Sequence, residues 1–200
     1  MKQIITILAL SLLLLFTACG PSVSVERVSS DTATDLSGKW NDTDSRLVAE
    51  EMIQDCLSRP WLIDFIEKQS NKPVVTVGRI RNNSSEHIDT ETFTKDFERE
   101  LINGGRVRFV GSKLERDDVR EERFDQHDFA SPETRKKLRD ELGADFILIG
   151  SIKSITDQAE GKKIQFYQTD LELINIETNE KVWIGTKKIK KGVSQGSVKW

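Results

Sequence analysis

The spacing of apolar residues divides the chain into a leader, a polar stretch and a long region of helical and strand-like patterns. A nearly unbroken apolar run covers residues 4–16, and no second run of this kind follows. Residues 20–41 are mainly small or polar and lack periodic apolar spacing. Because a segment without a buried face cannot offset its conformational entropy, we expect a flexible tether there.

Helical spacing predicts three helices in the first half of the remaining chain. The first follows Asp42 or Thr43, either of which can act as its N-cap, and places Cys56 on its buried face. Pro60 predicts the start of a second, short helix over residues 61–68. Asp89 or Thr90 can cap the third helix. Its buried face is formed by Phe93, Phe97 and Leu101, and it ends at Asn103-Gly104-Gly105.

Short apolar runs predict strands over residues 73–81, 107–111 and 146–152. Residues 112–128 are almost entirely charged, and we expect them to form a mobile surface excursion. Ser131-Pro132 predicts the start of a further helix that ends at Gly143. Its buried stripe would consist of Leu138 and Leu142.

The last third of the chain predicts two hairpins, with turns at Glu160-Gly161 and Thr178-Asn179. The final strand runs from Lys181 to about Lys190. Its lysines protect an exposed sheet edge, or alternatively form a basic edge for a partner. These lysines are Lys187, Lys188, Lys190 and Lys191, and the inward-facing residues of the preceding strand are Tyr167, Thr169, Leu171 and Leu173.

The order helix, helix, strand, helix, strand, helix and three strands predicts an α+β fold. We expect a single mixed β-sheet of about five strands with helices packed mainly on one face. The predicted domain organisation is a signal peptide over residues 1–18, the tether over 19–41, one domain over 42–192 and a C-terminal tail over 193–200.

The leader has the features of a bacterial signal peptide, with Lys2 before the apolar run and Thr17-Ala18-Cys19 after it. The run is shorter than the ~20 residues that a spanning helix needs. Small residues before Cys19 resemble a lipobox, although Phe16 stands where Leu is usual. We therefore expect Cys19 to be lipidated and to label with palmitate; the alternative is an ordinary secreted leader. Gly20, rather than Asp, favours the outer membrane, facing the periplasm.

The composition argues against catalysis and against nucleic-acid binding. The formal net charge is -3, with acids and bases mixed along the chain. The only histidines are His87 and His127, and there is no Gly-x-Ser-x-Gly motif. Asp125 and Asp128 beside His127 fit a solvated charged segment better than a metal site. We therefore expect no enzyme, no cofactor and no metal, and interpret Cys56 as a core residue.

Four blocks of the sequence together resemble the LpoB family of penicillin-binding-protein activators, whose soluble domain is similar to the N-terminal domain of TolB. These blocks are Asp35–Asp44, Arg79–Thr90, Glu141–Ser151 and Tyr167–Lys191. The resemblance implies an outer-membrane lipoprotein that regulates peptidoglycan biosynthesis by binding and activating a bifunctional class A penicillin-binding protein. The tether lacks the long Pro-rich stretch of enteric members. The alternative is an envelope or secretion-assembly lipoprotein that uses the same domain for protein interaction.

The second block indicates a candidate partner-binding loop at the end of a predicted central strand. Such strand ends are favoured binding places, but the same residues can simply close a turn and cap the next helix. Trp40 in the first block likewise either pins the start of the fold or offers an aromatic anchor to a partner. The loop candidates are Arg81, Asn82, Asn83, Ser84, Glu86 and His87.

Overall fold

The computed structural model describes residues 24–29, 32–35, 37–159 and 161–194. Contacts divide the chain into two units, Met1–Thr32 and Ala33–Trp200. In the first unit, residues 24–29 are exposed and have no regular secondary structure. The predicted signal peptide and Cys19 lie outside the described residues. The second unit, called the head below, contains all the described helices and strands.

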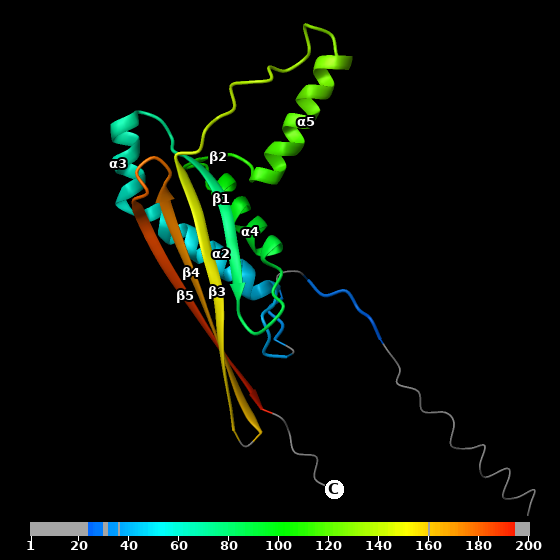
Figure 1. Cartoon of the computed structure of the whole chain (residues 1–200). Helices are drawn as coiled ribbons and strands as arrows, with labels where there is room; N and C mark the ends of the chain where they lie inside the picture. Colours follow the sequence, from blue (N-terminus) through cyan, green and yellow to red (C-terminus); the bar gives the residue numbers. More distant parts are fainter. Residues whose placement is uncertain (1–23, 30–31, 36, 160, 195–200) are drawn as a thin grey trace, which may run out of the picture. The chain divides into compact units, whose positions relative to one another are not determined.

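The described part of the head has four helices and five strands, which follow one another in the predicted order of types (Figure 1). They are α2 (Asp42–Ser58), α3 (Pro60–Gln69), β1 (Val74–Asn83), α4 (Thr90–Asn103), β2 (Arg108–Phe109), α5 (Lys113–Phe129), β3 (Phe146–Ala159), β4 (Lys162–Asn175) and β5 (Lys181–Ser194).

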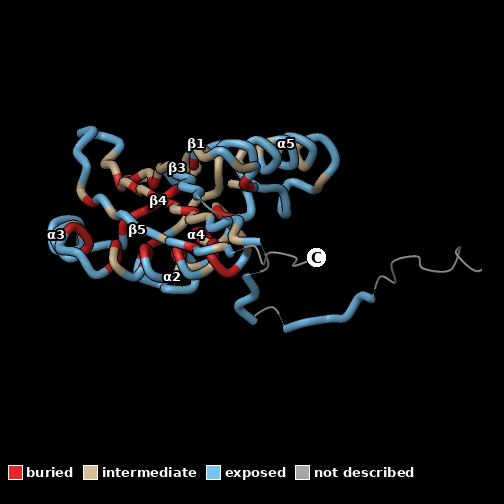
Figure 2. Tube along the Cα trace, turned by 90° about the horizontal axis from the view of Figure 1, so that it is seen from below, coloured by how far each residue is buried: buried red, intermediate tan, exposed pale blue. Residues whose placement is uncertain are grey.

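The five strands form a single mixed sheet in the order β2-β1-β3-β4-β5. β1 pairs in parallel with β2 and β3, whereas β3, β4 and β5 pair antiparallel. α2, α3 and α4 contribute to one core on one face of the sheet. Among the described elements, no helix packs on the other face, which is called the open face below (Figure 2). The predicted α+β fold is thus confirmed.

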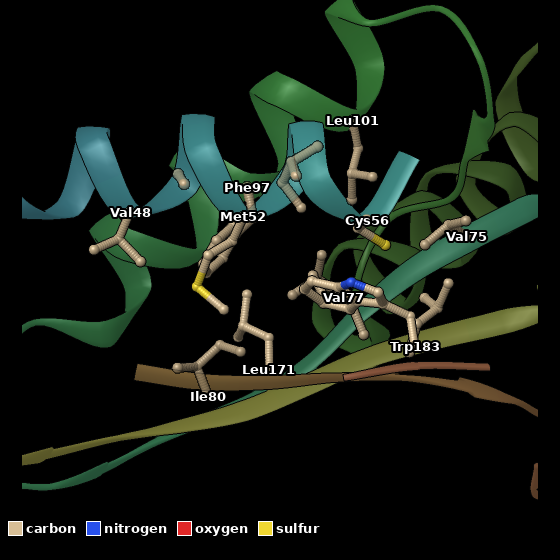
Figure 3. Close-up of a cluster of buried hydrophobic side chains, with 14 of the residues drawn as sticks. Val48, Met52, Cys56, Val75, Val77, Ile80, Phe97, Leu101, Leu171 and Trp183 are labelled. Carbon is tan, nitrogen blue, oxygen red and sulfur yellow. The ribbon is translucent and has the colours of Figure 1, made fainter. Parts of the chain in front are cut away.

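The core lies between α2, α4 and the covered face of the sheet (Figure 3). Met52 and Cys56 of α2 and Phe97 of α4 point toward Val77 and Leu171. The indole Nε1 of Trp61 donates a hydrogen bond of 2.7 Å to the backbone oxygen of Cys56. Cys56 is 1% exposed, and burial raises the pKa of its thiol to about 12. A thiol of this kind is a packing residue, as predicted.

Side-chain caps explain where the helices begin. Asn41 and Asp44 form a reciprocal capping box at the start of α2, one residue before the predicted cap at Asp42. Pro60 occupies the first turn of α3, where its missing N–H has no cost. The carboxylate of Asp89 accepts hydrogen bonds from the backbone N–H groups of Glu91 and Thr92, which fixes the start of α4.

Two expectations for the segment between β2 and β3 are wrong. The charged stretch after Ser112 is the 17-residue helix α5, which starts with a capping box between Ser112 and Glu115. Residues 131–143 contain no helix, and the predicted buried residues Leu138 and Leu142 expose 37% and 39% of their surface. Two leucines give too little apolar surface to hold a helix against the body, whereas the cap and ion pairs favour α5.

The predicted hairpins are present, with longer strands than expected. β3 and β4 pair over their full length. Asn179 adopts a left-handed conformation (φ 60°) in the turn before β5. β5 extends to Ser194, beyond the predicted domain end at 192, whereas β2 is shorter than predicted. The inward-facing residues of β4 have exposures of at most 1%, as predicted; they are Tyr167, Thr169, Leu171 and Leu173.

Candidate functional site

The structure places Arg81, Asn82 and Asn83 at the end of β1 rather than in the predicted loop, and polar side chains close the turn that follows. The amide nitrogen of Asn82 donates to the backbone oxygen of Glu86 (2.7 Å), and the amide oxygen accepts from the backbone N–H (3.0 Å) and the hydroxyl (2.6 Å) of Ser84. The backbone N–H of Ser85 donates to the hydroxyl of Ser154 on β3 (3.0 Å). Asn82 and Ser84 therefore shape the turn rather than face a partner.

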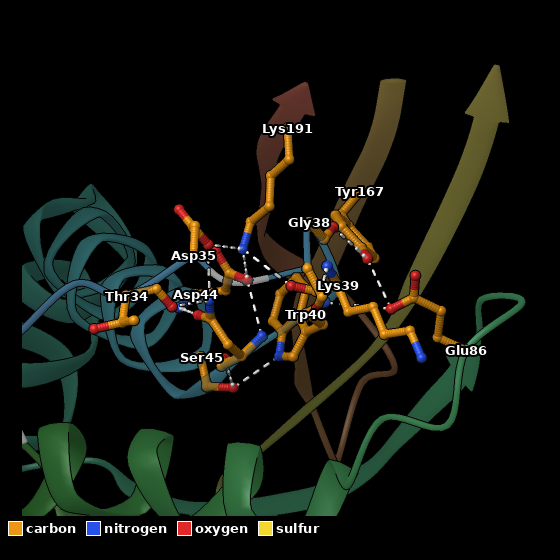
Figure 4. A network of polar contacts seen from close by, with 12 residues as sticks. Thr34, Asp35, Gly38, Lys39, Trp40, Asp44, Ser45, Glu86, Tyr167 and Lys191 are labelled. Atoms are coloured by element: carbon orange, nitrogen blue, oxygen red, sulfur yellow. Dashed lines mark hydrogen bonds and ion pairs between the residues drawn. The ribbon is translucent and has the colours of Figure 1, made fainter. Parts of the chain in front are cut away.

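Glu86 connects this loop to two distant parts of the chain (Figure 4). Its carboxylate accepts a hydrogen bond of 2.7 Å from the hydroxyl of Tyr167 and one of 3.2 Å from the backbone N–H of Trp40. Tyr167 is fully buried, and burial, followed by the hydrogen bond to Glu86, raises the pKa of its phenol above the ordinary range. Glu86 thus holds the loop after β1 against β4 and against the segment before α2.

Trp40 occupies a packing position. Its ring meets Phe93 edge-on at 5.7 Å between centroids and Tyr167 at 5.4 Å. Its indole Nε1 donates a hydrogen bond of 2.8 Å to the hydroxyl of Ser45. Gly38, two residues before, has φ 69°, and an added Cβ would lie 2.3 Å from Val193 on β5. These contacts attach the segment before α2 to the body of the head.

Lys191 fastens the same segment by an ionic cluster in which Lys191 and Asp44 are buried and Asp35 is exposed (Figure 4). Its ammonium donates hydrogen bonds of 2.6 Å to the carboxylates of Asp35 and Asp44, and one of 3.1 Å to the backbone oxygen of Lys39. Burial opposes the charge of Lys191, but the two carboxylates outweigh it and raise its pKa. The hydrogen bond from Lys191 lowers the pKa of Asp35.

Two sequence expectations are corrected by this cluster. Lys191 is 8% exposed, so it does not protect a solvent-facing edge, and the neighbouring Lys187 pairs with Glu51 of α2. The head also includes the segment from Asp35 to Trp40, which the sequence placed in the tether. We call this segment, residues 35 and 37–40, the strap. The strap lies in the first of the four blocks that carry the family resemblance, Asp35–Asp44, and packing explains why those residue types occur there.

The remaining loop candidates are exposed. The side chains of Arg81, Asn83 and His87 make no hydrogen bond or ion pair with the described residues. Arg81 and Asn83 lie on the open face, opposite Ser151 and Lys153 of β3. His87 lies in the loop next to the helix cap Asp89 and stands apart from that face. The structure therefore separates the candidates into a partly buried set, which is hydrogen-bonded within the head, and an exposed set.

The open face has a shallow groove of about 560 Å³ that the sequence did not indicate as a site. Asp170 pairs with Lys153 at 3.0 Å, and Ile184 exposes 64% of its surface. The alternation of residues along β3, β4 and β5 could have indicated an exposed face of the sheet, because every second residue is polar or only partly buried. The lining residues include Arg79, Arg81, Asn83, Ile149, Lys153 and Ile184.

The described residues offer no cluster of three or more His, Cys, Asp or Glu side chains that could hold a metal ion. Asp125, His127 and Asp128 lie on α5. In the same part of the chain, no helix is both long and apolar enough to cross a membrane.

The sequence model of the family described as "Peptidoglycan-synthase activator LpoB" matches residues 44–189. No match was found among curated proteins. Similar solved structures include the LpoB C-terminal domain from Escherichia coli (16% identity, TM-score 0.44, covering 76% of this chain and 99% of that one) and the NMR structure of E. coli LpoB (15%, 0.43, 90% and 86%). Lipoprotein GNA1162 from Neisseria meningitidis is a further one (14%, 0.38, 62% and 87%). Since the family match covers most of the sequence, the chain belongs to the peptidoglycan-synthase activator LpoB family.

Proposed function

We propose that this protein is an outer-membrane lipoprotein that binds a class A penicillin-binding protein in the periplasm and activates it. The observation that carries the proposal is the family match over residues 44–189. The lipobox at Cys19 supports lipid anchoring, and the tether lets the head bind a partner at a distance from the membrane. Tethering raises the effective concentration of the head near such a partner.

We infer that the open face, which bears Arg81 and Asn83, is the part of the head that contacts the synthase. Arg81 is exposed beside partly buried apolar side chains such as Ile149, and arginine beside apolar surface is typical of interface cores. Trp40, Asn82 and Glu86 are assigned to the internal structure because their polar groups are occupied within the head.

The test measures glycan polymerisation and cross-linking by the purified class A synthase of the same organism, with and without the chain from Gly20 to Trp200. We expect stimulation by the wild-type chain and a clear loss with Arg81→Glu, because a reversed charge opposes a complementary surface. Arg106→Glu is the matched control, since Arg106 is exposed and makes no described ion pair. His87→Ala should have a smaller effect than Arg81→Glu.

A folded wild-type chain that neither binds nor stimulates any class A synthase of its organism would reject the activator function. Capture of a different envelope complex by the same chain would then favour the assembly-lipoprotein alternative. Circular dichroism of each variant separates a lost contact from a lost fold.

A further inference from the structure

α5 is a helix without a packing partner. None of its 17 residues is buried, and it has no extensive contact with another described helix or strand. It projects away from the sheet (Figure 1). Its Leu114, Phe124 and Phe129 expose 78%, 61% and 83% of their surface. A single helix of this length is marginally stable in water, and most helices are stabilised by burying an apolar face. This helix therefore has surface available for a contact.

The charges of α5 are segregated around its axis. Arg120 and Arg123 pair with Glu141 of the following segment at 2.7 and 3.1 Å, so the basic side faces that segment. At about 100° per residue, the opposite arc of roughly 120° has acids and apolar residues but no base. This arc, called the acidic face below, contains Leu114, Asp118, Glu121, Glu122, Asp125, Asp128 and Phe129.

The open face of the sheet has the complementary character. Of its acids, Asp170 pairs with Lys153 at 3.0 Å and Glu172 with Lys181 at 2.9 Å, whereas Asp157 is exposed near the end of β3. Ile155 exposes 66% of its surface, and Ile184 exposes 64%. The basic side chains of this face outnumber its acids. The basic residues include Arg79, Arg81, Lys153, Lys188 and Lys190, which alternate with covered-face residues along β1, β3 and β5.

The topology indicates the open face as the place for α5. In the strand order β2-β1-β3, the connection from β1 through α4 leads to the neighbour on one side, β2. The connection from β2 through α5 leads back across β1 to β3, in the opposite direction. Connections between parallel strands share one hand, so helices of opposite direction belong on opposite faces. α4 packs on the covered face through Phe93 and Phe97. The same hand places α5 on the open face.

We propose that α5 closes over the open face, with its acidic face against the basic and apolar side chains of β1, β3 and β5. The projecting arrangement is then the open form. The chain can change direction at Gly111 before α5 and along residues 131–145 after it. The 15 residues of this second segment reach about 50 Å when extended, which is twice the ~25 Å length of α5. Closure would break the exposed ion pair between Lys95 and Glu115 and form new ion pairs between the acidic face and the open face.

Closure would cover Arg81 and so hide the surface assigned to the synthase. That consequence rests on the proposed function, whereas closure itself does not. The experiment below measures closure alone, so its failure leaves the synthase assay unaffected.

Spin labels at Ala130→Cys and Gln158→Cys, at the end of α5 and near the tip of the β3–β4 hairpin, report the position of the helix. The chain from Gly20 to Trp200 keeps only Cys56, whose burial and raised pKa protect it from labelling. Pulsed electron resonance should show a population with a shorter distance at low salt. At about 1 M salt that population should be lost, because the Debye length falls to ~3 Å.

The double variant Glu121→Lys and Asp125→Lys should abolish the shorter population. Its control, Glu67→Lys with Glu177→Lys, makes the same charge change at exposed sites away from α5, and should retain the population. A distance distribution that responds to neither salt nor charge reversal would show that α5 stays open, and would overturn the proposal. A shorter population that disappears when labelled chains are diluted with unlabelled ones arises between chains, and would overturn it too.

Discussion

Tyr167 is the only tyrosine of the chain, and its hydroxyl donates to the carboxylate of Glu86 from a fully buried position. Because burial and the carboxylate both disfavour the phenolate, the pKa of Tyr167 is raised above its ordinary value of about 10. A raised folded-state pKa stabilises the head below about pH 10. This stability is lost as the pH rises toward the folded-state pKa.

Glu86→Gln should lower the pKa of Tyr167, because it removes the negative charge but leaves the burial. Ultraviolet absorbance of the phenolate measures this directly, since no other tyrosine contributes. The variant should also cost about 1 kcal/mol of unfolding free energy, because a hydrogen bond to a charged group is replaced by a weaker one to a neutral amide oxygen. Glu67→Gln is the matched control on an exposed site. An ordinary pKa for Tyr167 in the folded wild type would contradict this account.

Lys191→Ala leaves the carboxylate of Asp44, which is 5% exposed, without its cation. Removing one partner of a buried ion pair is strongly destabilising, and we expect a loss of about 3 kcal/mol in urea unfolding. Lys188→Ala on the same strand is exposed and should change stability by less than about 0.5 kcal/mol. Equal effects of the two variants would show that the cluster does not hold the strap.

The sequence could not predict these residue roles. Lys191 meets Asp35 across 156 positions, and Tyr167 meets Glu86 across 81. A lysine in a strand rich in charged residues is predicted to be solvent-exposed, unless the carboxylates that it contacts from distant parts of the chain are known. Arg81 and Asn83, by contrast, are exposed, although they lie at the end of β1 and not in a loop.

At the scale of elements, strong apolar periodicity predicted α2, α3 and α4 well, because each buries that face in the core. α5 was missed for the opposite reason. It buries nothing, so periodicity gave no signal, although Ser112 and Glu115 have the spacing of a capping box. The segment after it has leucines at helical spacing, yet they are only partly covered and no helix forms there.

Two of the capped helices, α4 and α5, should respond differently to loss of their caps. Asp89→Ala should lower the unfolding free energy of the whole head by about 1 kcal/mol, because α4 packs in the core through Phe93. Ser112→Ala should instead reduce the protection of α5 alone from hydrogen exchange, since α5 can unfold without exposing core residues. A global loss from Ser112→Ala would contradict the picture of an independent α5.

At the scale of the whole molecule, the sheet and its three packed helices were predicted, while the boundary between tether and head was not. The tether was assigned up to residue 41 because it lacks periodic apolar residues. The strap, however, is held by one tryptophan, one glycine and an ionic cluster rather than by a periodic face. The proposed tether is therefore the 13 residues from Gly20 to Thr32, with a maximum reach of about 44 Å instead of about 75 Å.

A reach this limited should make tether length critical when the head is anchored. Deleting residues 24–31 would remove about 27 Å of reach. We expect cells that depend on the lipoprotein to lose its function, while the same deletion in the unanchored chain leaves stimulation of the purified synthase unchanged. Replacing residues 24–31 with a Gly-Ser sequence of equal length should restore the function, because reach and not sequence is required. Loss with the Gly-Ser replacement would instead indicate that the tether itself is recognised. Full function after the deletion would show that the partner lies close to the membrane, so that the head does not need the tether to reach it.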